Sequence, residues 1–178
     1  SDVTEGVKGP PVKRSVGIRK MSKNAVDPKD FLLNFPALVR NLPILEAATK
    51  KNKLSGFGMF NATPDEDGTI RNVPAFFVHE GKYFPSLAIE VLRIATRRPT
   101  VLMKTSFAGM QGVAVAKGLT VKTDRFGRIW PHFSKHDQDK YVSARELLDG
   151  TADPAKIKGK ILLVGTSAVG LRDIKTIP

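Results

Sequence analysis

Hydroxyl side chains near the C-terminus stand in a spacing close to that of a nucleophilic serine. Gly165, Thr166 and Ser167 follow an aliphatic run, and the serine of a Gly-x-Ser-x-Gly motif sits on a sharp turn between a strand and a helix. Here the second glycine comes one position late, at Gly170, and no histidine follows Ser167 to act as its base. The sequence therefore argues against covalent hydrolysis, and we expect no catalytic residue.

Two groups of potential metal ligands lack the geometry that a metal site needs. His132 and His136 are four residues apart, which on a helix puts two imidazoles on one face, but the Trp-Pro pair before them favours a strand and a loop. Asp65 and Asp67 are followed by Gly68, whereas a calcium loop of the EF-hand type needs its glycine two positions later. We therefore expect a tight turn at 65–68, no metal and no cofactor.

The loop that begins at Gly165 also has a non-catalytic interpretation. Its backbone amides and the hydroxyl groups of Thr166 and Ser167 could bind an anion, with Asp173 ordering the loop. Alternatively, these side chains only satisfy the backbone groups at the end of a strand. The loop has neither the Lys-Ser/Thr pair of a P-loop nor the Gly-x-Gly-x-x-Gly spacing. No phosphate-binding motif therefore decides between the two interpretations, and both stay open.

The segment that positions this loop is an aliphatic run. Ile161, Leu162, Leu163 and Val164 are consecutive and do not alternate with polar residues, which is typical of a strand covered on both faces in the middle of an α/β sheet. Ligands of open α/β sheets bind at the carboxyl ends of the strands. We therefore predict a buried strand that delivers the hydroxyl-bearing loop to the edge of the sheet.

Turn and capping signals divide the rest of the chain into short elements. The apolar periodicity predicts helices at 43–51, 86–97 and 143–148. Asp-Gly, Glu-Gly and Asp-x-x-Gly turns separate the predicted strands, which are expected at 56–61, 69–78, 100–104, 112–116, 119–123 and 128–133. The predicted fold class is α/β: a single domain with a mixed β-sheet and flanking helices.

Charge and composition limit the classes of partner. The chain has 178 residues, no cysteine and a formal net charge of +12. Residues 1–30 are rich in Gly, Pro and Lys and predict an irregular basic arm before a domain at 31–178. No apolar run approaches the roughly 20 residues that span a bilayer, and no nucleic-acid-binding motif accompanies the positive charge. We expect no specific binding of nucleic acid.

Several segments, in this order and at this spacing, resemble the type-two CHASE domain. The resemblance covers the chain from about residue 41 to its end, and its specificity lies in the ordered set, since each motif alone is common. The segments are Asn41–Ala48, Gly58–Asn61, Pro64–Pro74, Tyr83–Arg93, Thr123–Arg128, Lys158–Ala168, Asp173 and Thr176–Pro178.

The resemblance implies the later part of an extracytoplasmic sensor domain of bacterial adenylate cyclases, histidine kinases and related membrane receptors. The domain itself would not be an enzyme, and it would lie in the periplasmic or extracellular part of an inner-membrane protein. Its expected partners are an unidentified small-molecule or protein signal and the membrane helices of the same receptor, and a homodimer is compatible with this role. An adenylate cyclase is the expected output, with a histidine kinase as the alternative.

We expect the responsive surface where the loop at 165–173 lies near two acidic turns, at 65–68 and 124–127. The alternative is that these residues only form turns. The candidate ligand-binding residues are Thr166, Ser167, Asp173, Asp65, Asp67 and Asp124.

Overall fold

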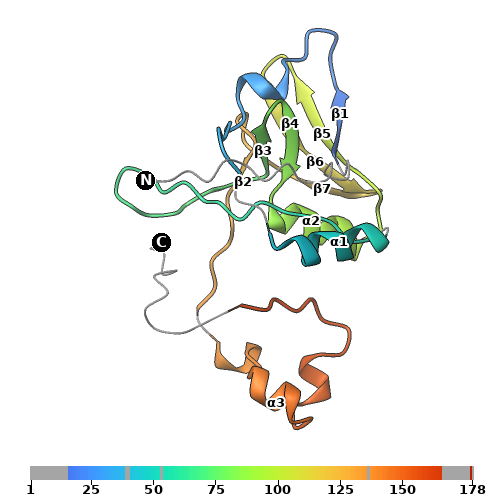
Figure 1. Ribbon diagram of the computed structural model, residues 1–178. Helices are drawn as coiled ribbons and strands as arrows, with labels where there is room; N and C mark the ends of the chain where they lie inside the picture. Colours follow the sequence, from blue (N-terminus) through green and yellow to red (C-terminus); the bar gives the residue numbers. More distant parts are fainter. Residues whose placement is uncertain (1–15, 39–40, 53, 136, 166–176, 178) are drawn as a thin grey trace. The chain divides into compact units, whose positions relative to one another are not determined.

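The computed structural model describes residues 16–38, 41–52, 54–135, 137–165 and 177. Its contacts divide the chain into two compact units, Ser1–Pro131 and His132–Pro178. All the strands of the described chain lie in the first unit (Figure 1). The described part of the second unit contains a short α-helix and two 3₁₀ turns.

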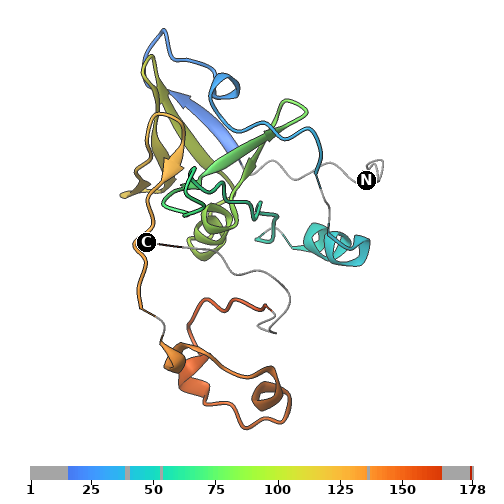
Figure 2. The ribbon, with the colours of Figure 1, turned by 90° about the vertical axis from the view of Figure 1, so that its left-hand side faces the viewer.

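The main sheet contains four strands in the order β1-β5-β6-β7. β1 (Val16–Lys20) pairs in parallel with β5 (Val101–Ser106). β6 (Gly109–Ala116) and β7 (Leu119–Val121) extend the sheet with antiparallel pairing (Figures 1 and 2). The sheet is therefore mixed, as predicted.

β1 corrects part of the expected irregular arm at 1–30. Residues 16–20 form a strand because two alternate aliphatic residues fit the register of β5: Val16 lies opposite Val101, and Ile18 lies opposite Met103. Residues 1–15 of the expected arm lie outside the described residues.

Two smaller antiparallel pairs complete the strands of the first unit. β3 (Phe76–His79) and β4 (Lys82–Pro85) form a hairpin through Glu80 and Gly81, at φ angles of 48° and 69°. Positive φ at both central residues is the twist that two-residue hairpin turns require. β2 (Val73–Pro74) pairs with β8 (Arg128–Ile129).

The three predicted helices are confirmed in place. They are α1 (Pro43–Lys51), α2 (Leu87–Ala95) and α3 (Ala144–Leu148). Ser86 caps α2, and Ser143 forms a capping box at the start of α3, so backbone amides without a helical partner are satisfied at both N-termini. Three short 3₁₀ helices occupy Pro28–Asp30, Gln138–Lys140 and Pro154–Lys156.

The hydrophobic core lies in the first unit, between α2, the hairpin and the main sheet. In β5, Val101 and Met103 are fully buried while Leu102 between them is exposed, which is the period of two that a sheet with one covered face produces. Ile89 of α2 and Phe76 of β3 pack into the same core. None of the described helices is long and apolar enough to span a membrane.

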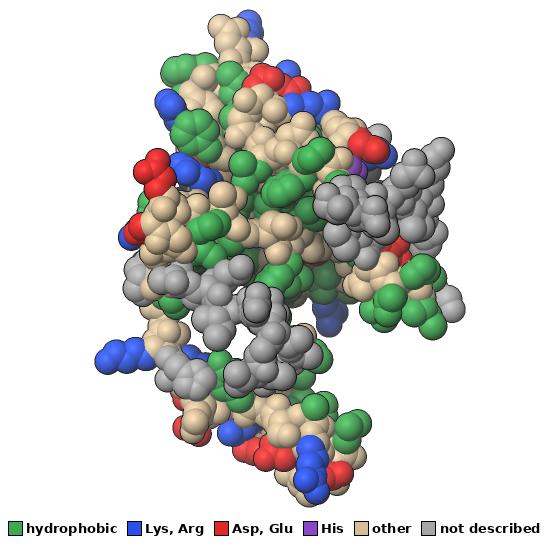
Figure 3. Space-filling view, turned by 60° about the vertical axis from the view of Figure 1, so that its left-hand side comes forward, with side chains coloured by type: hydrophobic (Ala, Val, Ile, Leu, Met, Phe, Trp, Pro, Cys, Tyr) green, Lys and Arg blue, Asp and Glu red, His purple; other side chains and the backbone are tan. Residues whose placement is uncertain are grey.

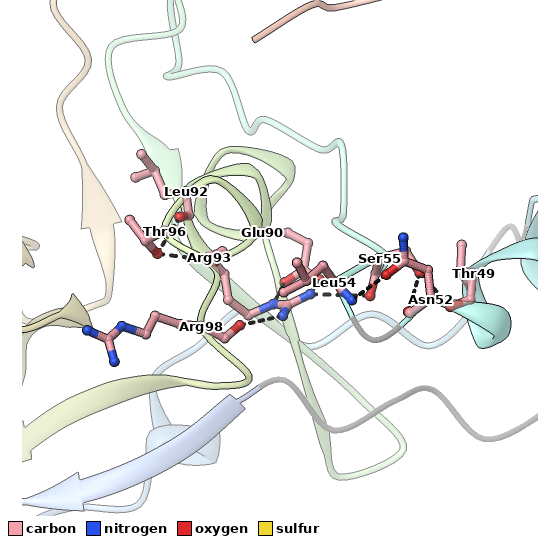
Figure 4. Close-up of polar contacts among 9 residues, drawn as sticks. All are labelled: Thr49, Asn52, Leu54, Ser55, Glu90, Leu92, Arg93, Thr96 and Arg98. Carbon is pink, nitrogen blue, oxygen red and sulfur yellow. Dashed lines mark hydrogen bonds and ion pairs between the residues drawn. The ribbon is translucent and has the colours of Figure 1, made fainter. Parts of the chain in front are cut away.

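A buried ion pair joins α2 to the chain before it (Figure 4). Arg93 donates from Nη2 to Oε1 of Glu90 at 2.6 Å and from Nε to Oε2 at 2.8 Å, and both side chains are only 2% exposed. The same guanidinium donates to the carbonyl oxygen of Arg98 at 2.7 Å and to that of Ser55 at 3.3 Å. The pair therefore holds one loop on each side of the helix.

The predicted strand at 56–61 does not form. Its only ladder contact is an isolated bridge between Met59 and Ser86. The segment instead passes close to α2: an added Cβ at Gly56 would lie 1.7 Å from Oε1 of Glu90, and one at Gly58 would lie 2.4 Å from Cα of Leu87. The two glycines serve close packing against the helix rather than a strand.

The predicted buried strand at 161–164 is wrong. The segment has no regular structure, and Ile161, Leu162, Leu163 and Val164 are 59%, 52%, 79% and 100% exposed. A strand needs a neighbour to receive its backbone hydrogen bonds, and the described residues of the second unit contain no strand. A run of consecutive aliphatic residues indicates that a segment would be stable if both its faces were buried, but it does not show that a strand is present to pair with it.

We expect Arg93→Ala to lower the free energy of unfolding by about 3–5 kcal/mol, because it leaves the Glu90 carboxylate buried without its partner. Urea denaturation checks this, with Arg98→Ala as the matched control, since the Arg98 side chain is exposed and its loss should cost less than about 0.5 kcal/mol. The double variant Glu90→Leu/Arg93→Met should recover most of the loss. Equal stability of Arg93→Ala and Arg98→Ala would contradict the importance of the pair.

Candidate functional site

The first acidic turn is held together by its own aspartates. Asp67 accepts from the backbone N–H of Thr69 at 3.0 Å, and its two carboxylate oxygens accept from Arg71 at 3.0 and 2.7 Å. Arg71 also donates to Oδ2 of Asp65 at 3.0 Å. Gly68 closes the turn at a φ of 79°. The predicted tight turn at 65–68 is confirmed, and the guanidinium of Arg71 lies between two carboxylates.

The second acidic turn repeats this arrangement. Asp124 accepts from the backbone N–H groups of Phe126 and Arg128 at 2.9 and 2.8 Å, and from Nε of Arg128 at 2.7 Å. In both turns an aspartate therefore binds the amide two residues later and the guanidinium four residues later. The Phe126 ring lies against the guanidinium groups of Arg125 and Arg128, 4.5 and 5.3 Å from its centroid.

The fold fixes the second turn against the core. The carbonyl oxygen of Gly127 accepts from the N–H of Ala75 at 2.8 Å, next to the paired strands β2 and β8. An added Cβ at Gly127 would lie 2.7 Å from Cδ2 of Leu32 and 2.9 Å from Sδ of Met110, and its φ is 78°. Only glycine fits both requirements without rearrangement.

The two turns share a cavity of about 370 Å³ in the first unit, within the range of about 300–1,000 Å³ that is typical of ligand pockets. We call it the two-turn cavity. Acidic and basic side chains lie close together around exposed apolar ones on the face of the molecule shown in Figure 3. The cavity is lined by Phe31, Leu33, Thr63, Pro64, Asp65, Asn72, Pro74, Phe76, Phe126 and Arg128.

The charges of the first turn reinforce each other. Hydrogen bonds from Arg71, and then the bond from the N–H of Thr69, lower the pKa of Asp67 well below its ordinary value of 3.8. In return, Asp67 and then Asp65 raise the pKa of Arg71. Both side chains stay charged over the whole physiological range.

The structure describes three of the six predicted site residues, and they have different positions relative to the two-turn cavity. Asp65 lines the two-turn cavity, and Asp124 binds Arg128, which lines it too. Asp67 does not line the cavity and acts on the turn through Arg71. Thr166, Ser167 and Asp173 lie outside the described residues, as does His136.

Sequence reasoning missed four residues that shape this site. Arg71 and Arg128 are the partners of the predicted aspartates, each four residues after its aspartate, and outside a helix this spacing alone does not indicate contact. Phe126 and Asn72 line the cavity. Asn72 gave no signal in the sequence, because only the fold shows that a polar side chain in this position is 6% exposed.

A second cavity of about 460 Å³ lies between α1 and β4. Its walls are mainly apolar and include Phe35, Phe57, Met59 and Phe84. None of the predicted site residues lies in it. The two-turn cavity is the better candidate because it combines charged, amide and aromatic groups, the mixture that fixes a ligand's orientation.

The fold defines the chain as an α/β domain with a mixed sheet. A family model for the CHASE2 domain matches residues 13–178, and the chain belongs to the CHASE2 domain family. This family consists of extracytoplasmic sensory domains of cyclases and kinases, and the domain is a sensor rather than a catalyst. Comparisons with curated proteins and with solved structures gave no match.

We expect Arg71→Gln to raise the pKa of Asp67 towards 3.8. The pKa of Asp67 is lowered in the folded state, so its stabilising contribution is complete above the unfolded pKa and is lost as the pH falls through the folded pKa. Carboxyl ¹³C NMR titration measures the shift. Arg145→Gln is the control, because Arg145 binds Asp149 with the same spacing and should leave Asp67 unchanged. An Asp67 titration that does not respond to Arg71→Gln would contradict the assignment.

Proposed function

We propose that this chain is the extracytoplasmic sensory domain of a bacterial inner-membrane receptor whose cytoplasmic output is an adenylate cyclase. Membership of the CHASE2 family is the observation that supports this proposal most directly, because the family's domains occur in cyclases and kinases. A histidine kinase is the alternative output. The signal is a small molecule that binds in the two-turn cavity of the first unit.

The mechanism requires two conformations of the receptor with different affinities for the signal. The two-turn cavity is suited to this role because its walls come from segments far apart in the sequence, including 31–33, 63–65 and 126–128. A ligand in contact with all three would stabilise the arrangement in which they lie close together. The membrane helices of the receptor would transmit that change to the output domain.

The position of the domain outside the cytoplasm can be tested by cysteine labelling, since the chain contains no cysteine. In a full-length receptor whose other cysteines have been replaced, Lys117→Cys should react with a membrane-impermeant maleimide in intact spheroplasts, because Lys117 is exposed in the turn between β6 and β7. Met103→Cys is the control: it is fully buried and should react only after denaturation. Labelling of Lys117→Cys only after lysis would place the domain in the cytoplasm.

The output can be tested with two glycine variants in a full-length receptor, expressed in bacteria that lack their own adenylate cyclase. Gly127 and Gly118 have φ angles of 78° and 79°, so alanine costs similar backbone strain at both. Only at Gly127 does an added Cβ meet neighbouring atoms. We expect Gly127→Ala to change the cellular cAMP level and Gly118→Ala to leave it unchanged. Background cAMP with the unmodified receptor, together with autophosphorylation by ATP, would identify a kinase instead.

A further inference from the structure

We propose that the two-turn cavity binds a free α-amino acid with an apolar side chain. The proposal rests on the sensory function proposed above and names the chemical class of its signal. It follows from three features of the cavity: an amide without a protein partner, charged groups of both signs with unused hydrogen-bonding atoms, and apolar walls.

Asn72 is the first feature. The residue is 6% exposed and lines the cavity, yet its side-chain amide forms no hydrogen bond with any other described residue. The buried side-chain polar atoms without a partner among the described residues belong to Ser22, Thr105 and Thr123, so the amide of Asn72 is open to the cavity rather than enclosed in the core. One carbonyl acceptor and two N–H donors are therefore available to a molecule in the cavity.

Arg128 is the second feature. Its Nε and its backbone N–H are bound by Asp124, and its guanidinium lies 5.3 Å from the Phe126 ring centroid. The two terminal nitrogens make no hydrogen bond within the described part of the chain. A guanidinium that is held on one edge presents the other as a fork for a carboxylate.

Asp65 supplies the opposite charge. Its Oδ2 accepts from Arg71 at 3.0 Å, whereas its Oδ1 accepts from no side chain of the described residues. A carboxylate oxygen at the cavity wall is a partner for an ammonium group. Asp65 and Arg128 both line the cavity, so a ligand there meets one group of each sign.

The charges of the two turns disfavour an anionic ligand. Residues 65–71 and 124–128 contain four carboxylates and three guanidinium groups, although the chain as a whole has a net charge of +12. A multiply charged anion would meet more repulsive than attractive charges here, whereas a zwitterion presents one group to each sign. The charged residues of these two ranges are Asp65, Glu66, Asp67, Arg71, Asp124, Arg125 and Arg128.

The apolar walls of the cavity favour a ligand with an apolar side chain. Phe76 is fully buried, and Phe31, Pro74 and Phe126 form further parts of the lining. Burial of a ligand's aliphatic or aromatic group against these walls is favourable, because it removes apolar surface from water. An amino acid such as leucine or phenylalanine has an apolar side chain for these walls, a carboxylate for Arg128 and an ammonium group for Asp65.

Isothermal titration of the purified 178-residue chain tests the ligand class. L-leucine and L-phenylalanine are the probes, compared with 3-methylbutylamine, which lacks the carboxylate, and 4-methylpentanoate, which lacks the ammonium group. We expect at least one amino acid to bind, and the analogues of leucine to bind at least about tenfold more weakly than leucine, because each loses charge-assisted hydrogen bonds. Absence of amino-acid binding at millimolar concentrations, or equal binding of leucine and either analogue, would overturn the proposal.

Two variants locate the site on the same chain. Asn72→Leu removes the amide at similar volume, and Arg128→Lys keeps the charge but loses the fork. Each should weaken binding of the amino acid at least about tenfold. Arg145→Lys is the matched control, since Arg145 also binds an aspartate four residues away but lies outside the cavity, and it should bind as the original chain does. Unchanged affinity in both cavity variants, with circular dichroism showing them folded, would exclude this site.

The two experiments test the ligand class and the output domain separately. Titration measures binding by the domain alone, whereas the cAMP measurement reports the full-length receptor. Amino-acid binding without cAMP production would support the ligand class and contradict the cyclase. A Gly127→Ala effect on cAMP without amino-acid binding would support the cyclase and contradict the ligand class.

Discussion

The buried ion pair of Glu90 and Arg93 is the constraint on which the arrangement of the first unit depends. Two charges removed from water are tolerated only when their hydrogen bonds are satisfied, and here the carboxylate and the guanidinium meet through two bonds. Two further N–H groups of Arg93 donate to the carbonyl oxygens of Ser55 and Arg98. The loops before and after α2 must therefore close around the pair, and Gly56 must be a glycine, because a side chain there would overlap Glu90.

A short series of hydrogen bonds links this helix to the candidate site. Ser86, which caps α2, donates its N–H to the carbonyl oxygen of Ala75 at 2.8 Å, and the N–H of Ala75 donates to Gly127 at the same distance. Gly127 closes the second acidic turn, in which Asp124 orients Arg128. The N-terminus of α2 is thus two backbone hydrogen bonds away from the wall of the two-turn cavity.

Local rules explain why much of the first unit could be predicted. The helix cap at Ser86 and the glycines at 68, 81 and 127 act within a few residues, so the sequence alone shows them. The strand at 16–20 was missed because its stability comes from pairing with β5, some 80 residues later in the chain. The aliphatic run at 161–164 failed for the related reason that its burial depends on a neighbour, which no local pattern supplies.

The difference between local and long-range interactions also explains which residues of the candidate site could be predicted. Asp65, Asp67 and Asp124 were recognisable because acidic residues before a glycine mark turns, but the sequence left turn formation and ligand binding as alternatives. The geometry makes the two roles compatible. Asp124 uses both its oxygens to hold Arg128 from one side, and by doing so it fixes the direction of the guanidinium's other edge. In the proposed complex with a ligand, a carboxylate that builds a turn would also orient the group that binds the ligand, because a preorganised donor loses less conformational entropy on binding than a mobile one.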